Sequence, residues 1–141
     1  MTPFDTALRV QRREVDSLRI SISVAVERLS DLERSHRENI DIARRERAST
    51  NEIWVPTDAW AARMRAERTR LLRDARDAEA RLAQLRSQAT ELYGTMRAIE
   101  QAADSYRAES ERTAATAEQT GLDDVVAARL VRNRLRPGDV R

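Results

Sequence analysis

The chain has 141 residues, of which 35% are charged and 40% hydrophobic, and its 26 basic and 24 acidic side chains nearly cancel. The length fits one domain, but with only 4% aromatic residues there is too little apolar material for an ordinary globular core. The chain has no cysteine and one histidine, His36, which argues against disulfides, thiol catalysis, zinc sites and histidine-based triads. We therefore expect no enzyme, no cofactor and no metal site.

The charge pattern argues against nucleic acid as a partner. Every basic residue is an arginine, and the net charge is only +2. Opposite charges alternate along the chain, which is typical of solvated helix faces. No apolar run approaches the ~20 residues that span a bilayer, and the first residues form no basic leader or secretory segment. We expect a cytoplasmic protein without a transmembrane segment.

The first long segment, about residues 4–48, contains neither glycine nor proline and has a heptad pattern of apolar residues. Such a repeat predicts a coiled-coil helix. Ile20–Val24 alternates as a strand does, but it is too short to override the surrounding helical pattern. The predicted inner positions are Phe4, Leu8, Gln11, Val15, Leu18, Ile22, Ala25, Leu29, Leu32, His36, Asn39 and Ala43.

A turn is predicted at about residues 49–56, because Pro56 disfavours a helical conformation at Val55. Thr57 suits the N-cap of the next helix, and Asp58 suits its first turn.

A second heptad segment is predicted for about residues 57–119, and its seam weakens after Tyr106. Gly121 is predicted to interrupt this helix, either as a C-cap or as a hinge, with a short helix following at about 122–135. The inner positions are Ala61, Met64, Arg68, Leu71, Ala75, Ala78, Leu82, Leu85, Ala89, Leu92, Met96, Ile99, Ala103 and Tyr106.

Two long heptad segments with a short connection predict an all-α fold: a long antiparallel two-helix coiled-coil hairpin with an overhanging C-terminal helical segment, forming a single domain over 1–141. A turn centred near residue 53 places position i opposite about 105 minus i. This register brings Phe4 near Tyr106 and gives Leu29 small partners, Ala75 and Ala78.

Polar residues interrupt the predicted seam at His36, Asn39 and Arg68. This layer is either a pH-sensitive weak point or a register-setting feature, and we favour the second interpretation.

Trp54, Trp60 and Met64 concentrate aromatic and sulfur-containing side chains in and beside the turn. They form either a hydrophobic plug or a partner-binding tip, and neither is preferred. Residues 63–86 carry eight arginines and four acidic residues. This basic stretch is either a solvated helix face, which we favour, or a surface that binds acidic partners or anionic lipid.

The chain resembles the FliJ family of flagellar export proteins, small coiled-coil components of the bacterial type III secretion apparatus. The resemblance rests on the opening Phe4-Asp-Thr-Ala-Leu-Arg-Val-Gln-Arg-Arg-Glu14 and the two proline-free heptad arms. It also rests on Ala103-x-x-Tyr106-Arg-Ala-Glu-x-Glu-Arg112 and Glu118-Gln-x-x-Leu122-Asp-Asp124. Together these motifs span roughly residues 4–134, and they are of low specificity.

The resemblance implies a stalk that couples the hexameric export ATPase to the cytoplasmic domain of the export gate and assists the recycling of export chaperones. Such a protein serves flagellum assembly and motility from the inner face of the cell membrane. The ATPase-facing end would follow Tyr106, with Leu122, Asp123, Asp124 and Arg129. Trp54 and Trp60 would lie in the part that contacts the gate. Gly121 departs from the family, in which this helix continues.

The alternative is a generic structural or adaptor coiled coil with an unrelated partner. An adaptor that dimerises through both seams would self-associate, whereas a hairpin uses its seams internally and is expected to be a monomer in isolation.

Overall fold

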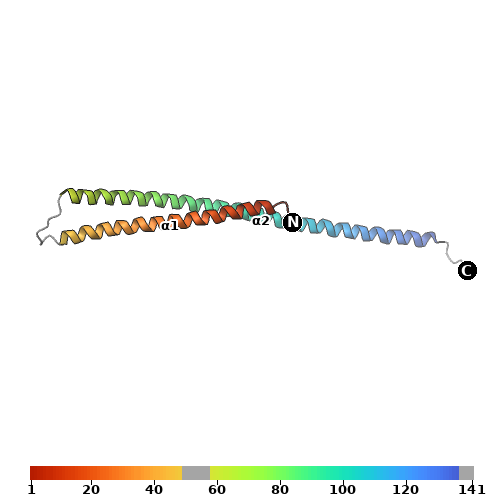
Figure 1. Ribbon diagram of the computed structural model, residues 1–141. Coiled ribbons are helices and arrows are strands. Elements are labelled where there is room, and N and C mark those ends of the chain that lie inside the picture. Colours follow the sequence, from red (N-terminus) through yellow and green to blue (C-terminus); the bar gives the residue numbers. More distant parts are fainter. Residues whose placement is uncertain (49–57, 137–141) are drawn as a thin grey trace. The chain divides into compact units, whose positions relative to one another are not determined.

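The computed structural model describes residues 1–48 and 58–136, and within them the chain forms two long helices and no strand. Helix α1 spans Asp5–Ala48 and α2 spans Asp58–Leu135 (Figure 1). The two helices pack against each other, which confirms the predicted all-α hairpin. The predicted turn, including Trp54 and Thr57, lies outside the described residues.

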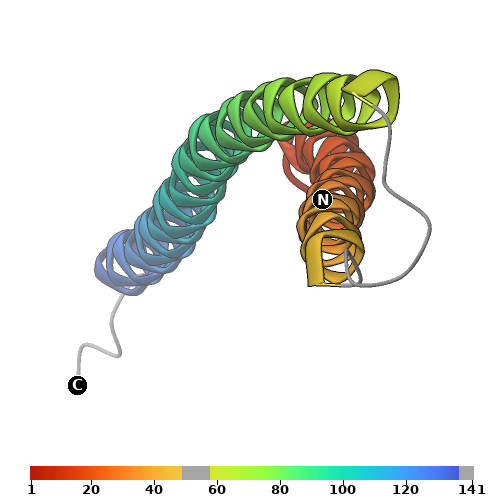
Figure 2. The same ribbon diagram turned by 90° about the vertical axis from the view of Figure 1, so that its left-hand side faces the viewer.

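Contacts between the helices show that they are antiparallel. Arg19, early in α1, donates a hydrogen bond to Tyr93, whereas Asn39, late in α1, donates to Met64, early in α2. Figure 2 looks at the pair from the end at which α1 finishes and α2 begins.

The helices contribute to two compact units. The central unit comprises Val10–Met96, and the terminal unit combines Met1–Arg9 with the part of α2 from Arg97 onward.

The core of the central unit is a single seam of apolar side chains. Its best-buried members all occupy predicted inner heptad positions, so the predicted seam is confirmed. Most other inner positions are half-buried, because a helix in a two-helix pair is covered on one side only. The buried apolar residues of this unit are Val15, Leu32, Ala43, Leu71, Leu82 and Leu85.

A polar layer interrupts this seam where the sequence predicts it. Asn39 is 5% exposed, and its Nδ2 donates to the backbone oxygen of Met64 at 3.3 Å. Its Oδ1 accepts a hydrogen bond from Nε of Arg68 at 3.3 Å. The predicted register places Asn39 opposite about residue 66, between these two partners. A buried amide with two cross-helix hydrogen bonds restricts sliding of α1 along α2, because a shifted register would leave it unpaired.

His36 belongs to the same seam, and its side chain is half-buried. Its Nε2 is buried without a hydrogen-bond partner among the described residues. The neighbouring Asn39 rather than His36 therefore supplies the directional contacts of the layer.

The predicted break at Gly121 is wrong, because α2 continues through this glycine to Leu135. Gly121 does not adopt a positive φ, so it lacks the left-handed conformation of a C-cap. A glycine inside a helix costs only about 1 kcal/mol relative to alanine, and extending an existing helix is easier than starting a new one. Helix-favouring residues on both sides, such as Ala117 and Ala127, offset that cost.

Replacing a seam leucine by aspartate should separate the helices of the central unit. Leu85 is 3% exposed, so Leu85→Asp buries an unpaired charge and should lower the free energy of unfolding by about 3 kcal/mol or more. Ala83→Asp, at an exposed position two residues away, is the matched control and should change it by less than about 0.5 kcal/mol. Urea denaturation followed by circular dichroism measures both. Equal losses would contradict the seam.

Gly121→Ala should stabilise the surrounding part of α2, because alanine loses less backbone entropy and no atom lies within 4 Å of the added Cβ. A gain of about 1 kcal/mol would slow local opening roughly fivefold. Hydrogen exchange of the amides of residues 115–128 measures this change. The reverse substitution Ala128→Gly should accelerate exchange by a similar factor, and faster exchange in Gly121→Ala would contradict a regular helix at this residue.

Candidate functional site

Tyr106, one of the predicted partner-binding residues, holds the beginning of α1 in the terminal unit. Its ring meets Phe4 edge to face, with 6.3 Å between ring centroids and an angle of 74° between the planes. The predicted proximity of these residues is thereby confirmed. Because Tyr106 is 46% exposed, one part of the ring supports the fold and another faces solvent.

A capping interaction that our sequence analysis missed fixes the chain just before this contact. Asp5 accepts two hydrogen bonds from Thr2, one from the backbone N–H at 3.0 Å and one from the hydroxyl at 2.7 Å. These hydrogen bonds, reinforced by the positive charges of the N-terminus and Arg107, hold the pKa of Asp5 below its ordinary value, although partial desolvation opposes the shift. The signal in the sequence is a threonine, a proline and an acidic residue at the spacing of a capping box.

Beyond this contact, α2 continues with every described side chain from Glu109 to Arg136 exposed. We call residues 109–136 the exposed segment. Its helical part is about 40 Å long at 1.5 Å per residue. Such a length of helix without a packing partner is unusual, because tertiary packing normally supplies most of a helix's stability.

The exposed segment carries large apolar side chains that are not confined to the direction of the seam. At about 100° per residue, Val126 lies about 140° around the helix from Ala103, which is 1% exposed in the seam of the terminal unit. Val125, by contrast, lies only about 40° around the helix from Ala103, so the apolar residues of the segment extend from the direction of the seam to other sides of the helix. Their exposed fractions are 61% for Leu122, 50% for Val125, 55% for Val126, 57% for Leu130, 56% for Val131 and 77% for Leu135.

These apolar side chains lie on several sides of the helix. Val131 is about 140° around the helix from Val126, and the small Ala127 and Ala128 occupy directions between the larger residues. Between 125 and 131 the only charged residue is Arg129. A helix with apolar residues on most sides is normally buried in a protein. This stretch is therefore a candidate binding surface.

The predicted acidic residues of the segment have no role in capping α2. Asp123 accepts a hydrogen bond from Gln119 at 3.0 Å, and Asp124 follows it inside the continuous helix. The helix dipole does not explain their presence, because they lie far from a helix N-terminus. Residues 125–136 instead contain four arginines and no acidic residue, so charge changes sign along the segment.

At the beginning of α2 lie Trp60 and Met64, the members of the predicted cluster beside the turn that the structure describes. Trp60 and Met64 are both half-buried. Met64 serves the seam, since its backbone oxygen and its Sδ both lie within hydrogen-bonding range of Nδ2 of Asn39.

Residues 1–48 and 58–136 lack two kinds of feature that would suggest other functions. Within them, no group of three or more histidine, cysteine, aspartate or glutamate residues is placed to hold a metal ion. No helix in this part of the chain is long and apolar enough to cross a membrane.

Comparisons with protein-family models, with characterised proteins and with solved structures find no match.

The Asp5 cap should weaken in acid. A carboxylate whose pKa is lowered by folding stabilises the fold above its unfolded pKa of about 3.9, and that stabilisation is lost as pH falls through the lower folded value. We expect the NMR signals of the Phe4 ring to move toward those of an unpacked ring below about pH 4. In Asp5→Asn they should already be shifted at neutral pH and lose this pH dependence. Asp16→Asn, at an exposed position elsewhere on α1, is the control and should behave as the unmodified chain.

Proposed function

We propose that this protein is a non-enzymatic stalk of the bacterial flagellar export apparatus, which couples the export ATPase to the export gate. The observation that carries the proposal is the exposed segment of α2, an unpaired helix on which apolar side chains between Val125 and Val131 point in several directions, with Arg129 as the one charged residue among them. The motifs that resemble the FliJ family extend into the same part of the chain, at Leu122–Asp124.

A ring-shaped partner matches such a helix better than a flat or grooved one. A groove covers one side of a helix and leaves the opposite side in water. Burying both Val126 and Val131 requires protein on nearly all sides, as the central opening of a hexameric ATPase provides. Desolvating these side chains would contribute about 1.5 to 3 kcal/mol for each one fully buried, before the costs of association.

The charges of the exposed segment suit insertion in one direction. Asp123 and Asp124 precede the apolar stretch, whereas Arg132 and Arg134 follow it. A ring with basic groups at its entrance and acidic groups deeper inside would accept the segment end first. Charge complementarity of this kind contributes orientation and specificity more than affinity.

The proposal also includes a contact with the export gate at the beginning of α2 and a location in the cell. Trp60, beside the predicted turn, is the candidate for contact with the cytoplasmic domain of the gate. The protein would work at the inner face of the cell membrane through the apparatus, assist chaperone recycling and be required for flagellum assembly and motility. Since its seams are used between α1 and α2, we expect a monomer in isolation.

Aspartate substitutions on opposite sides of the exposed segment test the encircling partner. Val126→Asp and Val131→Asp should each weaken binding to the export ATPase of the same organism at least tenfold, because each places a charge in an apolar contact. Thr120→Asp, exposed and just before the apolar stretch, is the matched control and should change binding by less than about threefold. Gel filtration of the mixture and the rate of ATP hydrolysis provide the measurements.

The pattern of losses separates the possible outcomes. Loss from both valine variants supports an encircling ATPase, whereas loss from only one indicates a partner on a single side. If the unmodified chain neither elutes with the ATPase nor alters ATP hydrolysis, the proposal is wrong, and an adaptor with an unrelated partner becomes the better explanation. Sedimentation over a dilution series tests the expected monomer.

A further inference from the structure

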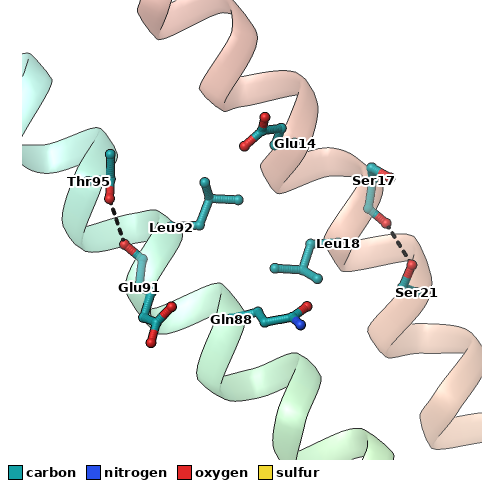
Figure 3. Close-up of a pocket in the computed structure, with 8 residues that line it drawn as sticks. All are labelled: Glu14, Ser17, Leu18, Ser21, Gln88, Glu91, Leu92 and Thr95. Atoms are coloured by element: carbon teal, nitrogen blue, oxygen red, sulfur yellow. Dashed lines mark hydrogen bonds between the residues drawn. The ribbon is translucent and has the colours of Figure 1, made fainter.

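An open groove of about 440 Å³ lies between α1 and α2 in the central unit (Figure 3). Leu18 and Leu92 point into it from opposite helices. Small polar side chains form its sides, and two hydroxyls among them are satisfied by their own helices. Ser21 donates to the backbone oxygen of Ser17 at 3.2 Å, and Thr95 donates to that of Glu91 at 3.1 Å. Because these two hydroxyls are already paired, the groove combines an apolar floor of two leucines with polar sides, and it has room for the side chains of a partner.

Two carboxylates, Glu14 and Glu91, line the same groove. Neither has an arginine three or four residues away on its own helix, although arginine is abundant in the chain. Within residues 1–48 and 58–136, neither makes an ion pair. The groove therefore carries two carboxylates that form no ion pair with an arginine of the described residues.

An exposed apolar ridge runs beside this groove on α1. Val10 and Val24 are 47% and 61% exposed, and each lies seven residues from Ser17, so the three share one line along the helix. Ile20, 67% exposed, adjoins this line. Residues 20–26 contain no charged side chain, in a protein whose residues are 35% charged. An uncharged stretch that exposes both Ile20 and Val24 is unusual in so charged a helix, and it makes this part of α1 a candidate interaction surface.

We propose that this groove docks a basic amphipathic helix of a partner protein, which lies along α1 and α2 as a third helix. Apolar side chains of the partner would cover Leu18, Leu92 and Val24. Arginine or lysine side chains of the partner would lie beside Glu14 at one place and beside Glu91 at another (Figure 3). The small side chains of Ser17 and Ser21 permit close approach of a helix backbone. This site belongs to the central unit and does not depend on the proposed contact of the exposed segment with an ATPase.

Two synthetic helical peptides test the proposal with the full chain. Both are about 20 residues long with the same stripe of leucine and alanine, and one flanks the stripe with arginines where its twin has glutamates. We expect the basic peptide to bind saturably and at least tenfold more tightly than its twin, as measured by fluorescence polarisation. Amide NMR shifts should change mainly at residues 14–24 and 84–95.

Variants of the groove decide whether it is the site. The double variant Glu14→Gln, Glu91→Gln should remove most of the preference for the basic peptide, and Val24→Asp should weaken binding of that peptide at least tenfold. Val26→Asp is the matched control. Val26 is 43% exposed, and it lies about 160° around α1 from Val24. Circular dichroism verifies that each variant remains helical.

Three outcomes would overturn the proposal: equal affinity for both peptides, shift changes centred outside the groove, or equal losses in Val24→Asp and Val26→Asp. A fourth outcome would show that the groove binds a second copy of this chain. The basic end of the exposed segment is itself an arginine-rich apolar helix. If sedimentation shows self-association of the unmodified chain that the Glu14→Gln, Glu91→Gln variant lacks, the groove binds a second copy instead of another protein.

Discussion

A pair of helices can bury only the stripe of each helix that faces the other, and this constraint governs the whole protein. The apolar residues at inner heptad positions, such as Leu32 and Leu85, fill that stripe in the central unit. The remaining circumference faces solvent and is expected to be polar. Apolar residues outside the stripe are therefore more informative here than in a globular protein, where a third or fourth element would cover them.

The heptad repeat explains why much of the fold could be predicted from sequence. The buried members of the seam, from Leu8 to Ala103, all occupy positions that the repeat assigns to the interface. The register predicted from the position of the turn places Asn39 near Arg68 and Phe4 near Tyr106, and the structure confirms both contacts. These predictions succeed because a coiled coil converts spacing in the sequence directly into position on a face.

Other features could not be read from the pattern, because they depend on competition between local preferences. Gly121 has the conformational freedom of a C-cap, yet the cost of one glycine is smaller than the cost of ending and restarting a helix. The Thr2–Asp5 cap has the spacing of a capping box, but it lies outside the heptad repeat, so the repeat does not predict it. The groove lined by Glu14 and Glu91 arises from two distant segments and required the structure.

The two proposed interaction surfaces are the groove of the central unit and the exposed segment of α2. They differ because α1 packs against α2 in the groove, whereas no helix packs against the exposed segment within the described residues. In the central unit α1 already occupies one side of α2, so a partner near Leu92 can approach only from outside the pair and meets a groove. Along the exposed segment no packing covers the helix, and a partner can reach Val126 and Val131 from different sides.

Continuous helical structure in α2 would allow force applied to Val126 to be carried along the backbone without a flexible joint at Gly121. A stalk requires this property, because a hinge at Gly121 would absorb the motion it should transmit.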